Sequence, residues 1–307
     1  MSIVVDNIVK TYGKQIAVDH LSFEVNKGEV VGFLGPNGAG KTSTMKMICG
    51  YLQADSGNIK VCNEAVSPES THFRQNIGYL PENNPLYLEM YIKEYLHFVA
   101  KCYNVGKNAP QMIQTAMERT GLLPEQHKKI QQLSKGYRQR VGLAQAILHQ
   151  PEVLILDEAT SGLDPNQLHE IRQLIREIGS EKSVLLSTHI MQEVEALCDR
   201  IIIINKGKIL ANEKTESLKN KHQGNIYRIE FLEKVPLQQL QNHFTKDTVK
   251  SLDSTQNVFH LQQSAGLNED LRPEIFNFSV KNNFTLIGLQ KEQNRLEDVF
   301  QAITQMS

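Results

Sequence analysis

The sequence predicts an α/β protein with a parallel sheet at its centre, followed by a smaller α+β domain. Short apolar runs rich in β-branched residues alternate with stretches of helical periodicity, as they do where helices connect parallel strands. The pattern is lost at 216–225, a polar stretch that is expected to be a linker. We therefore expect one domain over residues 1–215, with a helical subdomain at about 83–150, and an accessory α+β domain over 226–307.

A strand pattern, a glycine-rich loop and a helix follow one another near the N-terminus. The strand is Val30–Leu34, and the residues after it read Gly35, Pro36, Asn37, Gly38, Ala39, Gly40, Lys41, Thr42 and Ser43. In such a G-x-x-x-x-G-K-[ST] loop the glycines let backbone N–H groups point at phosphate oxygens, and the helix adds its positive N-terminal dipole. Lys41 can reach the β- and γ-phosphates, and the Thr42 hydroxyl can coordinate Mg²⁺. The pattern indicates a nucleotide-binding loop rather than a glycine-rich turn with an incidental lysine.

Composition excludes several classes of protein. The net charge of −1 gives no general affinity for nucleic acid or an anionic membrane. The longest apolar runs, such as Val153–Leu156, are too short to cross a bilayer. The four cysteines form no C-x-x-C pair, so neither zinc nor a disulfide framework is indicated. The N-terminus enters strand-like alternation directly, and no signal peptide is expected.

Two further places carry polar groups that can act on a nucleotide. The strand pattern Pro151–Glu158 delivers adjacent carboxylates, Asp157 and Glu158, at its C-terminal end, where parallel sheets bind ligands. Such a pair is costly without a cation, which Mg²⁺ on a nucleotide supplies. A later strand ends before His189, which could reach a γ-phosphate or serve as a structural donor. Tyr12, before a glycine turn, could stack on adenine or pack at the surface.

A fourth motif leads to a known family. The stretch Leu133, Ser134, Lys135, Gly136, Tyr137 begins a helical pattern between the phosphate loop and the carboxylate pair. It resembles the L-S-G-G-Q signature of ATP-binding cassette (ABC) ATPases, and over residues 1 to about 215 every motif stands in that family's order. The resemblance implies the P-loop NTPase fold of an ABC cassette, with a RecA-like core, an antiparallel β subdomain and a helical subdomain.

The resemblance also implies how the site works. Two cassettes form a homodimer or heterodimer, and each ATP lies between the phosphate loop of one chain and the signature of the other. Tyr12 then stacks on adenine, Gly35–Ser43 bind the triphosphate, and Thr42, Asp157 and Glu82 hold Mg²⁺. Glu158 polarises the attacking water and His189 contacts the γ-phosphate. Leu133–Tyr137, through Ser134 and Gly136, complete the partner's site, and Gly162–Asp164, with Asp164 at its end, resembles the loop that couples the two sites.

This chain departs from the family pattern at four positions. Glu82 stands where the family usually has Gln, and its carboxylate can still bind Mg²⁺ or water while changing the charge of the site. Lys135 and Tyr137 replace the Gly and Gln of the signature, and Lys135 adds a cation near the partner's nucleotide. Ala159 replaces a Pro, which is expected to be a mild change. None of the four removes a group that hydrolysis needs.

These variants, with a C-terminal domain ending in Leu296–Phe300, resemble the ATPase subunits of ABC-2-type exporters, most closely the gliding-motility-associated ATP-binding subunits. That resemblance implies a peripheral protein on the cytoplasmic face of the inner membrane. It implies a separate integral-membrane permease, docked near Glu82–Tyr95, and no nucleic-acid partner. An alternative is a non-transport ABC ATPase acting on ribosomes or DNA, which the single cassette without heptads, a Cys cluster or a basic face disfavours. A phosphotransferase would leave the signature unexplained.

Overall fold

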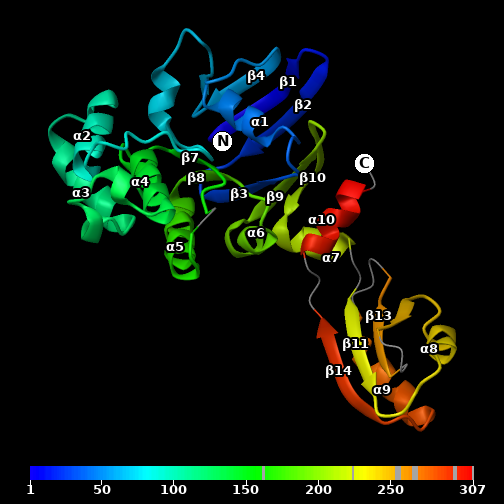
Figure 1. Cartoon of the computed structure of the whole chain (residues 1–307). Helices are drawn as coiled ribbons and strands as arrows, with labels where there is room; N and C mark the ends of the chain where they lie inside the picture. The colour runs from blue at the N-terminus through cyan, green and yellow to red at the C-terminus, as the bar shows by residue number, and fades with distance from the viewer. Residues whose placement is uncertain (161–162, 223–224, 253–256, 265–268, 293–295, 306–307) are drawn as a thin grey trace. The chain divides into compact units, whose positions relative to one another are not determined.

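The computed structural model describes residues 1–160, 163–222, 225–252, 257–264, 269–292 and 296–305 (Figure 1). The chain divides into two compact units, Met1–Glu213 and Lys214–Ser307. The first unit contains two sheets with their helices, and the second contains a smaller sheet with helices of its own. This arrangement contains both the α/β core and the small α+β part that the sequence predicts.

A six-stranded sheet forms the centre of the first unit, in the order β10-β9-β3-β8-β7-β6. Its strands are β3 (Glu29–Leu34), β6 (Ile77–Leu80), β7 (Val153–Asp157), β8 (Ser183–Ser187), β9 (Arg200–Asn205) and β10 (Lys208–Lys214). From β9 to β6 all neighbouring strands are parallel. Their C-terminal ends therefore meet at one edge of the sheet, where ligands bind in α/β folds.

A second, antiparallel sheet has the order β2-β1-β4-β5. Its strands are β1 (Ile3–Tyr12), β2 (Gln15–Val25), β4 (Ser56–Val61) and β5 (Glu64–Ala65). Apolar side chains of β1 and β2 join Phe33 of β3 and Met47 of helix α1 (Lys41–Ile48) in one core. Because β3 and α1 flank the phosphate loop, this core fixes the antiparallel sheet beside it.

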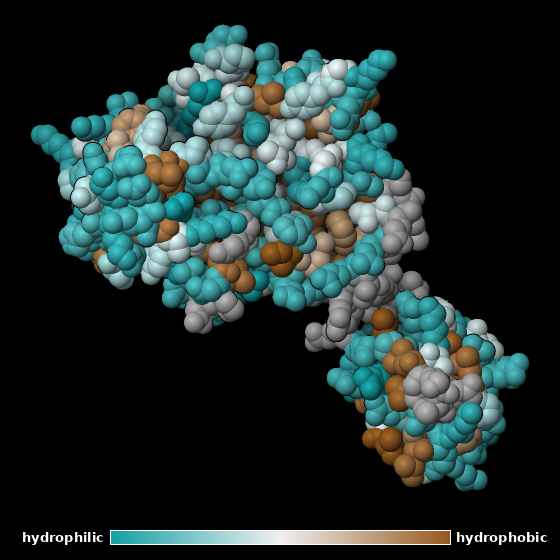
Figure 2. All heavy atoms as spheres, viewed as in Figure 1, coloured by the Kyte–Doolittle hydropathy of each residue, from teal (hydrophilic) through white to brown (hydrophobic). Residues whose placement is uncertain are grey.

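The remaining helices of the first unit are α2 (Ile92–Cys102), α3 (Ala109–Arg119), α4 (Lys135–Ile147), α5 (Pro165–Glu181) and α6 (Met191–Leu197). Between α2 and α3 the backbone of Asn104 and Gly106 has positive φ angles of 54° and 71°, which end the first helix. The surface of this unit that Figure 2 presents is largely hydrophilic, as expected when helices and strands bury their apolar faces.

The second unit has the β-α-β-β-α-β order of a ferredoxin-like fold. Its elements are α7 (Thr215–His222), β11 (Ile226–Phe231), α8 (Leu237–His243), β12 (Thr248–Ser251), β13 (Val258–Gln262), α9 (Arg272–Lys281), β14 (Leu286–Glu292) and α10 (Leu296–Gln305). The sheet is antiparallel with the order β12-β13-β11-β14. Tyr227, Ile229 and Phe231 of β11 pack with Leu240 of α8 and Phe278 of α9 in a core of its own.

Helix α7 (Thr215–His222) occupies most of the stretch 216–225 that the sequence predicts to be a linker. The segment carries one apolar residue within the helix, Leu218, so no periodicity is visible in the sequence. Leu218 is nevertheless fully buried, and α10 packs against α7. Tertiary packing therefore decides the helix, as it does for most short helices.

Candidate nucleotide site

The phosphate loop joins β3 to α1 and needs glycine at two positions for steric reasons. A Cβ atom at Gly35 would overlap the carbonyl oxygen of Ile204 in β9. One at Gly40 would overlap the carbonyl oxygen of Ala17 in β2, and Gly40 has a positive φ of 106° besides. The loop backbone thus lies close to two strands of different sheets, β9 and β2.

Lys41 is the first residue of α1 and lies inside the loop. Its Nζ donates to the carbonyl oxygens of Gly35 at 2.7 Å and Pro36 at 3.1 Å. The side chain is buried, and this desolvation lowers the pKa of Lys41, while Glu158, Asp157 and Glu82 act to raise it. The ammonium is therefore a cation held at the loop, with carboxylates close enough to influence it.

Asp157 ends β7 and is 1% exposed. Its Oδ1 accepts a hydrogen bond of 2.6 Å from Ser187 Oγ, at the end of the neighbouring strand β8. Its Oδ2 is also buried but has no hydrogen-bond partner. A buried carboxylate oxygen without a donor is costly, so this atom fits a cation or a water bound to one. Within the described ranges no cluster of three or more His, Cys, Asp or Glu side chains is arranged to hold a metal.

Glu158 and His189 form a pair at the same edge of the sheet. His189 Nδ1 lies 2.9 Å from Glu158 Oε1, and the Glu158 N–H donates to Ser187 O at 3.1 Å. Glu158 has a positive φ of 55°, a strained conformation that turns the chain as it leaves β7. The structure thus brings two separately predicted site residues into direct contact.

The candidates for one nucleotide surround a single open cavity of about 490 Å³. Strands β1 and β2, the phosphate loop, α1 and the ends of β6, β7 and β8 contribute to it. Its lining includes Tyr12, Asn37, Gly38, Gly40, Lys41, Thr42, Ser43, Glu82, Asp157, Glu158 and His189. The structure therefore brings together the aromatic, the loop, the carboxylates and the histidine that the sequence singled out separately.

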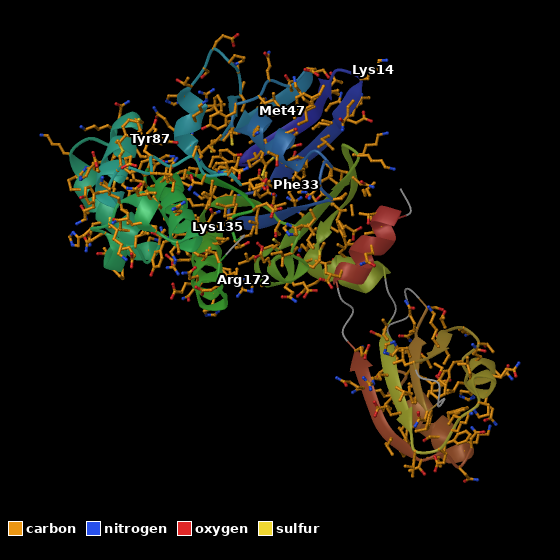
Figure 3. All side chains as sticks on the ribbon, in the orientation of Figure 1. Lys14, Phe33, Met47, Tyr87, Lys135 and Arg172 are labelled. Atoms are coloured by element: carbon orange, nitrogen blue, oxygen red, sulfur yellow. The ribbon has the colours of Figure 1, made fainter. Side chains whose placement is uncertain are left out.

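The signature lies elsewhere in the first unit, at the start of α4. Ser134 caps this helix, its Oγ accepting from the Tyr137 N–H at 3.3 Å, so α4 begins within the signature, at Lys135. Lys135 is exposed at the helix start (Figure 3), whereas Leu133 and Gly136 are buried. None of the residues from Leu133 to Tyr137 lines the nucleotide cavity, and all five are described.

Asp164 stands beside the signature. It caps α5, its Oδ1 accepting from the Gln167 N–H at 2.9 Å, and the Gln167 side chain reaches Gly136. The N-termini of α4 and α5 are therefore adjacent. The other part of the expected coupling loop, Gly162, lies outside the described residues.

Comparison with known proteins decides the family. The family described as ABC transporter matches residues 18–161. Over 298 residues the chain is 33% identical to the bacitracin transport ATP-binding protein BcrA of Bacillus licheniformis, covering 96% of this chain and 94% of BcrA. The chain is an ATP-binding protein of the ABC transporter family. As a member of that family it binds and hydrolyses ATP.

This ABC ATPase is also similar to a second ATP-binding protein by sequence and to a solved ABC cassette by structure. One is the Nod factor export ATP-binding protein I of Burkholderia orbicola, 36% identical over 214 residues that cover 69% of this chain and 70% of that protein. The other is the dimeric structure of a bacterial ABC transporter cassette. It is 24% identical, with a TM-score of 0.65 over 69% of this chain and 98% of that one, and it shows the same fold.

The expected permease-docking segment of this ABC ATPase carries exposed aromatic residues. Tyr87, labelled in Figure 3, is 54% exposed. It makes edge-to-face contacts with Tyr95 and Phe98 of α2, with ring centroids 6.0 and 5.5 Å apart. Leu88 and Tyr91 are also exposed. The segment thus presents an apolar surface next to Glu82, which lines the nucleotide cavity.

Sequence reasoning missed the polar residues that hold this ABC ATPase's motifs in place. Ser187 donates to Asp157, and Thr188 donates to Oε2 of the buried Glu193 at 2.8 Å while accepting from the Ile190 N–H. The signal available was the pair of hydroxyl residues, Ser187 and Thr188, directly before His189. A strand that ends in hydroxyls beside a carboxylate strand provides donors for its neighbour.

Proposed function

We propose that this ABC ATPase is the motor subunit that drives a separate membrane permease, and that the transport is export. The ATP-binding proteins similar to it serve bacitracin transport and Nod factor export. The chain covers nearly all of the first of these. Among the described residues no helix is long and apolar enough to cross a bilayer, so another polypeptide supplies the membrane path.

The observation that carries the proposal is the group of Lys41, Asp157, Glu158 and His189 around one cavity. Lys41 and the loop N–H groups bind the β- and γ-phosphates, and Tyr12 stacks on the base. Glu158 orients and polarises the attacking water. His189, whose Nδ1 lies 2.9 Å from Glu158 Oε1, contacts the γ-phosphate.

Mg²⁺ with the nucleotide would be held by Thr42, by Asp157 through a water, and by Glu82. The unpartnered Oδ2 of Asp157 supports this placement. When bound, the ion would neutralise negative charge on the phosphates. Ser187 holds one oxygen of the cavity-lining Asp157 at 2.6 Å and leaves its other oxygen available for the ion or its water.

A pair of cassettes, identical or different, completes the site. The signature lines no part of its own chain's cavity, although Ser134 and the free N–H groups at the start of α4 form an anion site. In a head-to-tail dimer they contact the γ-phosphate bound by the partner, and Asp164 lies at the junction. ATP binding closes the pair, and hydrolysis and phosphate release open it.

The motion passes to the permease through Glu82–Tyr95. The exposed Tyr87, Leu88, Tyr91 and Phe98 are the contacts that we assign to the permease's cytoplasmic helix. The ATPase is then peripheral to the cytoplasmic face of the inner membrane. A role in gliding motility stays a prediction, since the similar proteins named above are described by bacitracin transport and Nod factor export.

The Glu158→Gln variant tests this function. Hydrolysis is expected to fall by about 10²–10⁴-fold, the usual contribution of a general base, while Mg·ATP still binds and an ATP-bound dimer accumulates. Phosphate release and size-exclusion chromatography with ATP measure the two effects. Glu152→Gln, at an exposed carboxylate paired with Lys27 and Lys182, is the matched control. Unchanged turnover in Glu158→Gln would refute the role given to Glu158.

A further inference from the structure

Asp55 holds the end of β1 in a way that the motifs do not explain. Its Oδ2 accepts from the Thr11 N–H and from Thr11 Oγ1, both at 2.7 Å. Its Oδ1 accepts from Lys10 Nζ at 2.6 Å. Its own backbone N–H donates to Val9 O at 2.8 Å. One residue therefore binds three consecutive residues of β1, directly before Tyr12.

This stretch of β1 has no regular ladder on the side of β4. The pairing of β1 with β4 ends at Val9, opposite Ser56, and the register with β2 shifts between Lys10 and Thr11. The Thr11 N–H, which a longer β4 would have paired, is taken by the Asp55 carboxylate. Asp55 thus replaces a strand neighbour and fixes the direction in which β1 leaves the sheet.

Lys10 connects this contact to the Tyr12 ring. Its Nζ lies 5.9 Å from the ring centroid, within the range of a cation–π interaction, and is held there by Asp55. Lys10 and Tyr12 are two positions apart in a strand, so they share one face of it. The same Tyr12 lines the nucleotide cavity together with Gln15 across the hairpin.

We propose that Asp55 is a positioning residue for the nucleotide base: through Thr11 and Lys10 it sets the plane of the Tyr12 ring on which adenine stacks. The inference rests on the stacking role proposed for Tyr12. Preorganising an exposed aromatic removes an ordering cost that binding would otherwise carry. Tyr12 is 50% exposed, and a free side chain at that exposure samples several rotamers.

The contact is permanent rather than a switch. Hydrogen bonds from Lys10 and then Thr11 lower the pKa of Asp55 to about 2. The folded-state pKa lies below the ordinary value of 3.8, so the carboxylate is charged at neutral pH and loses its charge only as the pH falls toward 2. Base positioning by Asp55 is therefore constant across the pH range in which ATP hydrolysis is measured.

The chain contains no tryptophan, which gives a direct probe of the ring. In the full chain, Tyr12→Trp creates a single tryptophan, excited apart from the tyrosines at its red edge, that ATP is expected to quench by stacking. Dissociation constants for ATP, GTP and inorganic tripolyphosphate are then measured with and without Asp55→Asn, a nearly isosteric change that keeps the fold. Asp6→Asn, at an exposed aspartate within β1, is the matched control.

Asp55→Asn is expected to weaken ATP binding about 3- to 10-fold and to reduce the preference for ATP over GTP. Tripolyphosphate has no base, so its binding stays within twofold, as does kcat at saturating ATP. Lys10→Met, which removes the cation and keeps the Thr11 contacts, is expected to give a smaller loss of the same kind. Asp6→Asn changes none of these values.

Two results would overturn the inference while leaving the proposed function intact. In the first, Tyr12→Ala weakens ATP binding but Asp55→Asn and Lys10→Met do not. In the second, Asp55→Asn weakens ATP and tripolyphosphate equally, which means a general structural role. A different failure, in which Tyr12→Ala itself leaves ATP binding unchanged relative to tripolyphosphate, would instead refute the stacking role of Tyr12, and the inference with it.

Discussion

Single glycines decide whether the phosphate loop can form. Gly35→Ala would force a methyl group against the carbonyl oxygen of Ile204, a backbone atom that cannot move without shifting β9. We expect ATP binding to weaken at least tenfold. Isothermal titration with ATP checks this, with Gly106→Ala as the control. A Cβ at Gly106 meets nothing within 4 Å, and its positive φ of 71° carries only local strain. Equal ATP affinity in the two variants would contradict the steric argument.

Glu82 adds a negative charge to a site that already contains Asp157 and Glu158. All three carboxylates act on Lys41, so they also act on any phosphate bound there. Glu82→Gln is expected to tighten the binding of metal-free ATP about 3- to 10-fold, or about 0.7–1.4 kcal/mol, and to weaken the dependence on Mg²⁺. Titrations in EDTA and in Mg²⁺ measure both effects. If metal-free ATP bound no better, the charge of Glu82 would not reach the nucleotide.

Local sequence patterns were sufficient to predict some of the candidate site residues. Lys41, Asp157 and Glu158 each follow a buried strand, so their place at the sheet edge follows from the strand order. The contacts of Ser187 and Asp55 could not be predicted from a local pattern, because their partners lie 30 and 44 residues away in the chain. Nothing in a short pattern states which distant strand end will lie opposite a given hydroxyl or carboxylate.

At the scale of elements, the strands with a clear local pattern were predicted, and a strand that depends on distant contacts was not. The buried strands β3 and β7 were predicted within two residues at each end, because continuous apolar runs bounded by turns leave few alternatives. Strand β12 was missed: it is four residues long, and Val249 is its one apolar residue. Its pairing with β13, and the burial of Val249, determine it.

His149 joins the helical segment to the central sheet and predicts a pH effect. Its ring stacks on Tyr103 at 3.7 Å, and Nε2 lies 3.0 Å from Ile77 O of β6. Burial lowers the pKa of His149 from 6.5 to about 4. Between these values the unfolded chain binds a proton that the folded one does not, so stability falls as the pH falls, by at most about 1.4 kcal/mol per unit.

Urea unfolding at pH 7 and pH 5, followed by circular dichroism, tests this effect. The His149→Gln variant is expected to be less stable at pH 7, because the stacked ring is lost, yet to lose less stability between the two pH values. His127→Gln serves as the control, because His127 is exposed. An unchanged pH dependence in His149→Gln would assign the acid sensitivity to other groups.

At the scale of the whole molecule, the proposed mechanism divides the ATP site between two places in the first unit, the phosphate loop and the start of α4. No residue from Leu133 to Tyr137 lines the cavity around Lys41. In the mechanism that we propose, a second chain completes the site. The proposed dimer would also account for Lys135, a cation at the positive end of α4, because the partner's nucleotide would compensate both charges.

Cross-linking between two copies tests this arrangement directly. One copy carries Ser134→Cys and the other Asn37→Cys, next to Gly38 in the phosphate loop, both in a Cys102→Ser background that removes the exposed native cysteine. With Glu158→Gln to slow hydrolysis, Mg·ATP is expected to raise the disulfide-linked heterodimer several-fold, and neither copy alone should form it. Metal-free buffer without nucleotide is the control, because closure needs the phosphates to hold both surfaces. If the linked dimer never formed, or formed equally without nucleotide, the signature would not face the partner's phosphate loop, and the two-site mechanism would have to be abandoned.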